Sequence, residues 1–173
     1  AALGLFSAWF FRDPDREIPQ DPSLVLSPAD GRVTAVDESA GGLVVTIFLN
    51  VFNVHVNRVC ETGTVRRVAY FPGKFFSANL DKASRDNEHN AVFLETAAGH
   101  PVTIVQIAGL VARRIICRVQ AGDAVQRGQR FGMICFGSRL DVYLPPDARL
   151  AVAKGDKVRA GASVLAYLGQ TPS

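Results

Sequence analysis

Hydrophobic and polar residues alternate over short stretches along most of the chain, with Gly and Pro between the stretches. Alternation with a period of two predicts half-buried β-strands, and many short strands separated by turn signals favour an all-β sandwich or barrel. Two stretches, 2–11 and 76–86, favour short helices instead. The sequence therefore predicts a mainly β domain with one or two short helices. The predicted strands cover residues 31–37, 43–50, 63–71, 91–97, 101–109, 130–136, 139–145 and 163–168.

A repeated motif supports a particular kind of β domain. The pattern G-D-x-V-x-x-G occurs at Gly122–Gly128 and again, 33 residues later, at Gly155–Gly161. An apolar stretch follows each copy, as in the two halves of biotinyl- and lipoyl-type barrel-sandwich domains. Those carriers hold a lysine between the halves, whereas the corresponding stretch here, CFGSRLDVYLPPDA, has none. The resemblance thus predicts a barrel-sandwich-like scaffold and no carrier function.

Composition limits the classes of function. The chain has 173 residues, of which 48% are hydrophobic, and a formal net charge of +3. This length suits one domain, and the small positive excess fits an anionic ligand or membrane surface better than nucleic acid. Cys60, Cys117 and Cys135 form no C-x-x-C pair and are odd in number, which argues against a disulfide framework and favours a reducing compartment. No Cys/His spacing indicates a metal site.

The first 11 residues carry no charge and are followed abruptly by RDPDRE. A stretch of this length is too short to span a bilayer, which needs about 20 residues, and no basic region of a signal peptide precedes it. We interpret residues 1–11 as an interfacial anchor or the end of a longer hydrophobic segment. Trp9 would then lie at the membrane surface, with Arg12 and Arg16 on the cytoplasmic side. A strand or helix docked on the domain is the alternative.

The stretch ICFGSRLDVYLP, residues 134–145, places a serine on an apolar face. Ser138 shares the parity of Leu140, Val142 and Leu144, directly after Gly137. A β-bulge or tight bend explains this pattern structurally. Chemically, the Ser138 hydroxyl could attack the carbonyl carbon of Gly137 in an N-to-O acyl shift. β-Elimination of the ester and loss of ammonia would leave a pyruvoyl group at position 138.

Two further residues could assist such chemistry. Asp30, in LSPADGRV, is either part of a plain β-turn or a carboxylate able to orient a histidine. His55, in FLNVFNVHVNRV, shares its parity with Asn53 and Asn57, which indicates a polar cluster or a structural histidine. Histidine is the side chain that exchanges protons most readily near neutral pH.

The segment 70–93 combines aromatic residues with Lys74, Lys82, Asn87 and Glu88. A loop of this length is often a lid or binding segment, and aromatic side chains beside lysines suit a lipid surface. The alternative is a surface loop that contains a small helix.

Taken in order, the stretches from Phe10 to Leu168 resemble the short form of phosphatidylserine decarboxylase, and together they are far more specific than any one of them. The resemblance is carried by FFRDPDREIP, SPADGRV, FLNVFNVHVNRV, YFPGKFFSANLDKASRDNEHN, VTIVQIAGLVARRI, GDAVQRGQRFGMICFGSRLDVYLP and GDKVRAGASVLAYL.

The resemblance implies a proenzyme that cuts itself between Gly137 and Ser138. The products would be a β chain, 1–137, and an α chain, 138–173, which begins with the pyruvoyl group made from Ser138. Asp30 and His55 match positions of the cleavage apparatus. The pyruvoyl carbonyl would condense with the serine amine of phosphatidylserine, and loss of CO2 would give phosphatidylethanolamine. His55 is our candidate to protonate or orient the intermediate.

The same resemblance implies a cofactor made by the chain itself, a phospholipid substrate, and a place on the cytoplasmic face of the cell membrane. Residues 12–173 would form the catalytic domain. The sequence leaves open whether two copies of the cleaved β and α chains associate as a homodimer. No nucleic-acid partner is expected.

The chain departs from the family pattern near the candidate site. Longer forms carry a second histidine three residues after the first, where this chain has Arg58. They also follow the cleaved serine with threonine, where this chain has Arg139, and proline is common at the position of Cys60. A triad that needs the second histidine therefore cannot be transferred intact, so His55 must act or Asp30 must act without it.

Three alternatives remain at this stage. The same chemistry could act on another serine-headed lipid, such as the archaeal ether lipid archaetidylserine. The domain could be a non-catalytic barrel-sandwich module that binds a lipid or a partner, with no cleavage at Ser138. A pyruvoyl enzyme for a soluble amino acid would leave the apolar N-terminus unexplained.

Overall fold

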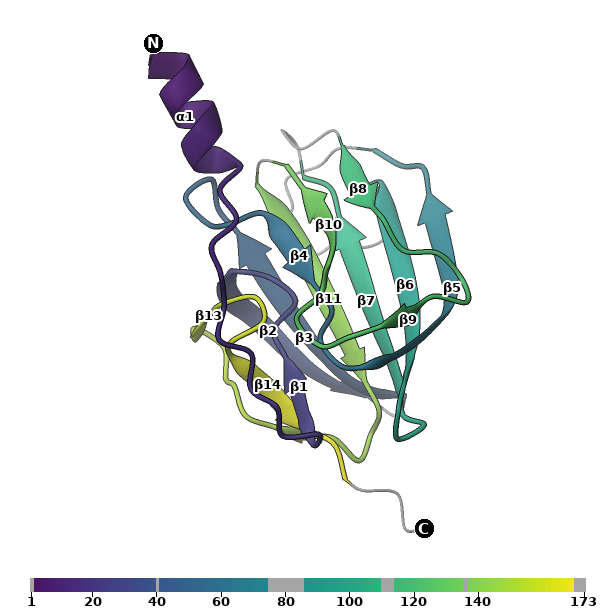
Figure 1. Cartoon of the computed structure of the whole chain (residues 1–173). Helices are drawn as coiled ribbons and strands as arrows, with labels where there is room; N and C mark the ends of the chain where they lie inside the picture. Colours follow the sequence, from purple (N-terminus) through teal and green to yellow (C-terminus); the bar gives the residue numbers. More distant parts are fainter. Residues whose placement is uncertain (1, 40, 75–85, 110–113, 136, 170–173) are drawn as a thin grey trace.

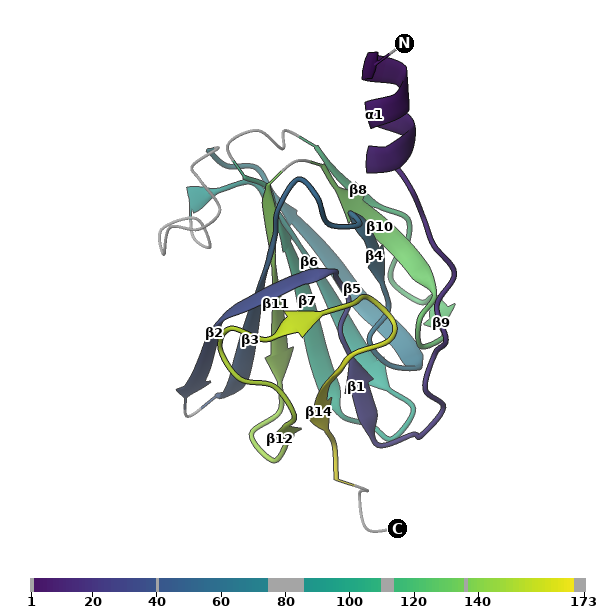
Figure 2. The ribbon, with the colours of Figure 1, turned by 90° about the vertical axis from the view of Figure 1, so that its left-hand side faces the viewer.

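A computed structural model describes residues 2–39, 41–74, 86–109, 114–135 and 137–169 of the chain. The described residues form one eight-stranded sheet, two three-stranded sheets and an N-terminal helix, α1 (Ala2–Phe10). The large sheet curls into a half-barrel, and the two small sheets lie over its concave side (Figure 1, Figure 2). The predicted mainly β, barrel-like fold is confirmed.

The strands of the large sheet run antiparallel to their neighbours. Their order is β13 (Lys157–Val158), β2 (Gly31–Ser39), β3 (Gly42–Leu49), β11 (Ser138–Leu144), β7 (Pro101–Ile107), β6 (His89–Thr96), β5 (Gly63–Phe71) and β9 (Ala124–Val125). One small sheet has the order β1 (Leu24–Leu26), β14 (Val164–Tyr167), β12 (Arg149–Leu150). The other has the order β4 (Val56–Arg58), β10 (Arg130–Ile134), β8 (Ile115–Cys117).

The alternation along β11 sets the core as the sequence predicts. Leu140 and Val142 are fully buried and pair with Ile47 and Val45 of β3, which are also fully buried. Tyr143, on the other parity, is 43% exposed. These side chains belong to one core with residues of the small sheets, such as Val25, Phe131 and Leu165, and their burial stabilises the packing of the sheets.

The two G-D-x-V-x-x-G copies take equivalent places in the fold. They form β9 and β13, the two outermost strands of the large sheet. Asp123 and Asp156 each accept a hydrogen bond at 2.9 Å from the backbone N–H three residues earlier. The first and last glycine of both copies have positive φ, a conformation that favours glycine. The repeat therefore closes both edges of the sheet with the same turn.

Helix α1 stands away from the body of the protein (Figure 1, Figure 2), as the 2–11 pattern predicts in type and place. Leu5 is 73% exposed, and Phe6, Trp9 and Phe11 are also exposed. Among the described residues, no helix combines the length and the apolarity needed to cross a bilayer. The second predicted helix, 76–86, lies outside the described residues except for its last position.

The described parts of segment 70–93 are held by backbone hydrogen bonds and by a buried side chain. The backbone of Lys74 bonds to Asp86 and Glu88, and the Asn87 side chain is buried and donates to the Ala108 carbonyl at 2.7 Å. Lys82 lies outside the described residues, so the proposed lid or lipid contact there stays a prediction.

All three cysteines are free thiols. Burial raises the pKa of Cys60 to about 12, while Cys117 and Cys135 are half-buried.

Candidate active site

Ser138 is the first residue of β11 and pairs with Leu49, the last residue of β3. Its side chain is fully buried on the inner face with Leu140, and its Oγ has no hydrogen-bond partner among the described residues. A buried polar group without a partner costs roughly 1–3 kcal/mol and is rare, so such a group points to a functional role.

Gly137 makes the bend that precedes this serine. Its φ is +59°, and a Cβ added there would meet nothing within 4 Å. The left-handed backbone, and not crowding, is therefore what favours glycine here. The bend that the sequence predicts therefore lies directly before the buried serine.

His55 precedes β4 and is fully buried. The ring of Phe10, the last residue of α1, packs on the imidazole with a centroid distance of 4.2 Å. Neither ring nitrogen has a partner in hydrogen-bond geometry among the residues described.

Burial lowers the pKa of His55 to about 4. A contact with the Asn53 backbone and the charge of Asp30 act in the opposite direction, and the charge of Arg12 adds to the lowering. The imidazole is therefore neutral near pH 7 and can accept a proton without first losing one.

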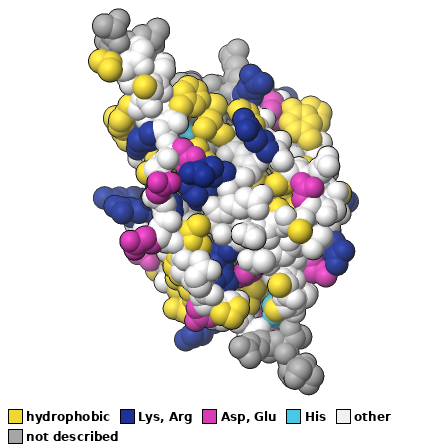
Figure 3. All heavy atoms as spheres, in the orientation of Figure 1, with side chains coloured by type: hydrophobic (Ala, Val, Ile, Leu, Met, Phe, Trp, Pro, Cys, Tyr) yellow, Lys and Arg dark blue, Asp and Glu magenta, His cyan; other side chains and the backbone are white. Residues whose placement is uncertain are grey.

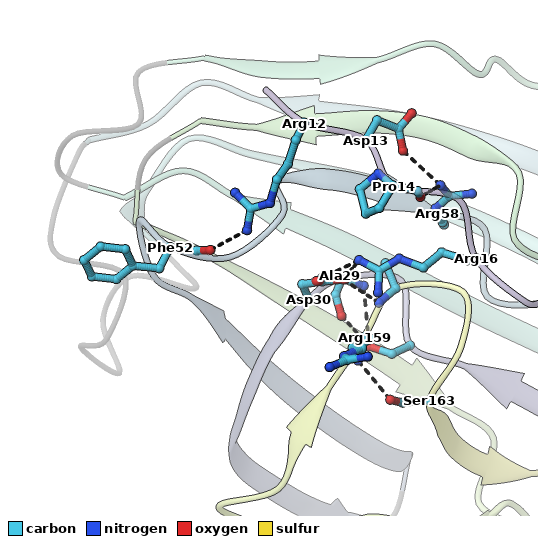
Figure 4. Close-up of polar contacts among 12 residues, drawn as sticks. Arg12, Asp13, Pro14, Arg16, Ala29, Asp30, Phe52, Arg58, Arg159 and Ser163 are labelled. Carbon is cyan, nitrogen blue, oxygen red and sulfur yellow. Dashed lines mark hydrogen bonds and ion pairs between the residues drawn. The ribbon is translucent and has the colours of Figure 1, made fainter. Parts of the chain in front are cut away.

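Asp30 does not hydrogen-bond to His55. Its carboxylate accepts two hydrogen bonds from Arg16 Nη2, at 3.0 and 2.9 Å, and one from the Ala160 N–H at 2.8 Å (Figure 4). Its influence on His55 is therefore electrostatic, and its direct contacts anchor the N-terminal segment.

Arg58 occupies the place of the second histidine of longer forms and is 5% exposed. It donates to Asp13 Oδ1 at 2.9 Å, to the Pro14 carbonyl at 3.1 Å and to the Gly128 carbonyl at 3.0 Å (Figure 4). Its contacts thus hold the stretch 10–18, which we call the N-terminal strap, against the domain. Arg58 is thus a structural cation at the position where the resemblance led us to look for a second histidine.

Arg139, the other departure beside the site, lies on the opposite face of β11 from Ser138. Its guanidinium donates to both oxygens of Asp141, at 2.7 and 2.9 Å, and to Thr46 at 3.3 Å. It stabilises the outer side of the strand and leaves the inner face unchanged.

A chain of buried amides lies near these residues, and the sequence indicated only part of it. Asn90 Nδ2 donates to Gln106 Oε1 at 3.0 Å, and Gln106 Nε2 donates to Asn57 Oδ1 at 2.9 Å. Of the predicted polar cluster, Asn57 belongs to this amide chain, and His55 is equally buried but packs on Phe10. Asn53 instead accepts from the Asn50 N–H in a turn. The sequence did offer a signal for Gln106, because it is a polar residue within the apolar stretch 101–109.

The strap contacts also escaped sequence reasoning. Phe10 covers His55 and Arg16 neutralises Asp30, although neither follows from spacing along the chain. The charged stretch RDPDR did offer a signal for these contacts, because its Asp13 pairs with Arg58 and its Arg16 pairs with Asp30.

A cavity that is separate from the candidate site is lined by residues around Thr62, Thr96 and Leu168. It measures about 570 Å3, and its lining includes the buried ion pair of Glu61 and Arg127 together with His100. In the described part of the chain, no three His, Cys, Asp or Glu side chains are grouped so that they could hold a metal ion.

Comparison with known proteins identifies relatives over nearly the whole chain. The family model described as phosphatidylserine decarboxylase matches residues 3–166. A phosphatidylserine decarboxylase proenzyme of Syntrophus aciditrophicus is 52% identical, over 93% of this chain and 79% of the relative. The proenzymes of Burkholderia pseudomallei and Cupriavidus taiwanensis are 53% and 54% identical, over 98% and 96% of this chain and 82% and 80% of the relatives.

Proposed function

The chain belongs to the phosphatidylserine decarboxylase family, and we propose that it becomes active by cutting its own backbone between Gly137 and Ser138. As a member of this family it is a carboxy-lyase that converts phosphatidylserine to phosphatidylethanolamine and CO2. The archaeal lipid and the non-catalytic module are not favoured by these relatives. The observation that carries the cleavage proposal is the buried Ser138 hydroxyl, which has no partner among the described residues and follows a left-handed glycine.

The surroundings of Ser138 fit a pyruvoyl group at this position. Such a group has no hydroxyl to satisfy, and Leu49 and Leu140 beside it are fully buried. When present, a pyruvoyl group supplies an electrophilic carbonyl that condenses with the substrate amine and accepts the electron pair left by CO2. An apolar setting favours loss of a charged carboxylate as neutral CO2.

The chain's own residues would perform the cleavage. Ser138 Oγ attacks the Gly137 carbonyl carbon, the peptide C–N bond breaks, and the backbone nitrogen takes up a proton. The resulting ester loses the Gly137 carboxylate by β-elimination, and water then displaces ammonia at position 138. His55, neutral because burial lowers its pKa, is our candidate to take the hydroxyl proton. Asp30 would favour the transient imidazolium through its charge.

The test of cleavage is intact-mass analysis of the purified chain. Wild type should give two chains that correspond to 1–137 and 138–173, whereas Ser138→Ala should remain one species near 18.6 kDa and inactive. Ser27→Ala is the matched control, because Ser27 is equally buried but donates to the Ala29 carbonyl at 2.7 Å. Cleavage that persists in Ser138→Ala, or that fails equally in Ser27→Ala, would contradict the proposal.

We also propose that the end of the protein carrying α1 docks on the cytoplasmic face of the cell membrane. Phe52, 70% exposed, lies at the same end, since its ring is 6.1 Å from that of Trp9 and its carbonyl accepts from Arg12 at 2.7 Å. Hydrophobic side chains with neighbouring Lys and Arg gather on α1 and this end of the body (Figure 3). Ser138 pairs with Leu49, three residues before Phe52, so the candidate site is close to the proposed membrane surface.

Vesicle co-sedimentation tests the membrane proposal. Trp9→Ser with Phe52→Ser should reduce binding to vesicles of anionic lipid at least tenfold, because both are amphipathic or apolar side chains that would leave water. Tyr143→Ser, which removes an aromatic residue of similar exposure on β11, should leave binding unchanged. Equal losses in both variants would contradict this docking surface.

A further inference from the structure

The buried amide chain ends in a donor that no described residue accepts, and we propose that this donor, Asn57 Nδ2, binds the carboxylate of the lipid's serine headgroup. Asn57 would thereby distinguish the substrate from the product, since phosphatidylethanolamine lacks that carboxylate. The proposal rests on Ser138 being the reaction centre.

The direction of the hydrogen bonds in the chain is fixed by a backbone group. Gln106 Nε2 donates to the Ile116 carbonyl at 3.2 Å as well as to Asn57, and a carbonyl can only accept. The amide of Gln106 therefore cannot be turned over, and the atom of Asn57 that faces it must be Oδ1. The Nδ2 of Asn57 is consequently directed away from the chain, and it has no acceptor among the described residues.

The two hydrogen bonds of the chain run in the same direction. Asn90 donates to Gln106, and Gln106 donates to Asn57, so each bond polarises the next and strengthens the final donor. Asn57 and Gln106 are fully buried, and Asn90 is 3% exposed. A line of aligned donors in a dry interior is an arrangement suited to an acceptor oxygen that arrives with a ligand.

The register of the sheet places Gln106, the hydrogen-bond partner of Asn57, near Ser138. Gln106 of β7 pairs with Leu140 of β11, which follows Ser138 by two residues on the same face. Diagonal neighbours of this kind are about 7–8 Å apart. Asn57, from β4, contacts Gln106 from the facing small sheet, and the fully buried His55 lies two residues before it. Asn57 is thus one side-chain contact away from Gln106, a diagonal neighbour of the proposed reaction centre.

A neutral amide suits a carboxylate that must leave. A guanidinium would hold the charged form in a strong ion pair and so oppose its loss as CO2. The half-buried Arg16 and the buried Arg58 are already engaged by Asp30 and Asp13. Asn57 can instead fix the orientation of the carboxylate with a weaker, uncharged hydrogen bond.

The test compares Asn57→Asp with Asn90→Asp. Asn57→Asp keeps an oxygen for Gln106 and the side-chain volume, but at pH 8 it replaces the free donor with a negative charge. In the cleaved enzyme we expect the KM for phosphatidylserine to rise roughly ten- to a hundredfold, as for loss of a hydrogen bond to a charged group. The inhibition constant of phosphatidylethanolamine should stay within about threefold. Asn90→Asp, the same change at the far end of the chain, removes only the bond that polarises Gln106, so it should change the ratio of the two constants by a smaller factor than Asn57→Asp does.

A second readout does not depend on the cofactor. Calorimetry on Ser138→Ala proenzyme should show tighter binding of dihexanoyl phosphatidylserine than of dihexanoyl phosphatidylethanolamine, and Asn57→Asp or the smaller Asn57→Ser should abolish that preference. The proposal is overturned if both constants change by the same factor, if Asn90→Asp has the same effect as Asn57→Asp, or if the binding preference survives. Cleavage of the Ser138→Ala chain would instead contradict the proposal that Ser138 is the reaction centre. Failure of that proposal can therefore be told apart from failure of the Asn57 proposal.

Discussion

The buried, neutral His55 gives the protein a stability that depends on pH. Its pKa is about 4 in the folded chain and near 6.5 when the side chain is exposed to water. The folded state therefore binds this proton less readily than the unfolded state. Stability from this group is complete above pH 6.5 and is lost progressively as the pH falls from 6.5 to 4.

The magnitude follows from linkage. One unit of pKa difference corresponds to about 1.4 kcal/mol, so His55 should reduce the free energy of unfolding by about 2 kcal/mol between pH 7 and pH 5. Because the side chain is fully buried, solvent screening gives little reason to reduce this figure.

The assay is urea unfolding of Ser138→Ala chain, which stays uncut and can be treated as one cooperative unit. His55→Asn in the same background removes the titrating ring and keeps a similar polar shape. Other acidic groups titrate in both proteins, so the difference in pH dependence between them isolates His55.

Equal pH dependence in the two proteins, within about 0.5 kcal/mol, would refute the reasoning. A direct check is the imidazole proton resonance, which should titrate near pH 4; a midpoint near 6.5 would show that the ring is hydrated. The self-cleavage rate should likewise be flat between pH 5 and 8, where the ring remains neutral.

Three further substitutions test the contacts of the N-terminal strap and the bend at Gly137. Arg16→Met should lower the free energy of unfolding by roughly 3 kcal/mol in urea unfolding, because it leaves Asp30 buried with only one donor; recovery in a double variant with Asp30→Asn would confirm that cause, and no loss would contradict it. Gly137→Ala should cost about 1–2 kcal/mol through its positive φ and slow the chain cut, while Gly137→Asn should be milder; equal rates in all three proteins would exclude a role for this bend. Arg58→Met should remove the bonds of Arg58 to Asp13 and to the Pro14 carbonyl while the Arg130–Asp13 ion pair stays, and the loosened strap should be cut faster by a protease with cleavage at Ser138 retained; an unchanged digest would show that Arg58 is not what holds the strap.

The longer strands could be predicted because their alternation follows from one buried face. β5 and β11 appear within a residue of their predicted bounds. The strands of two or three residues, such as β4 and β12, are too short for a period to show. They form because the small sheets cover the concave side of the large one, which is a tertiary effect.

The site was less predictable because its contacts join distant parts of the chain. Ser138 could be singled out from parity and from the glycine before it, and both features are present in the structure. The sequence allowed Asp30 to be part of a β-turn or a carboxylate that orients a histidine, and in the structure Arg16 binds the carboxylate. The bond between Gln106 and Asn57 spans 49 residues, and no local pattern specifies it.

The position of β11 decides what a cut at its first residue would do to the molecule. β11 lies inside the large sheet, with β3 on one side and β7 on the other, and β13 and β14 pair with β2 and β1. Every one of these neighbours belongs to residues 1–137. The two products would be interleaved strand by strand, so they could not exchange partners or separate on dilution without unfolding. A molecule cut in this way would keep for its lifetime the partner with which it was translated.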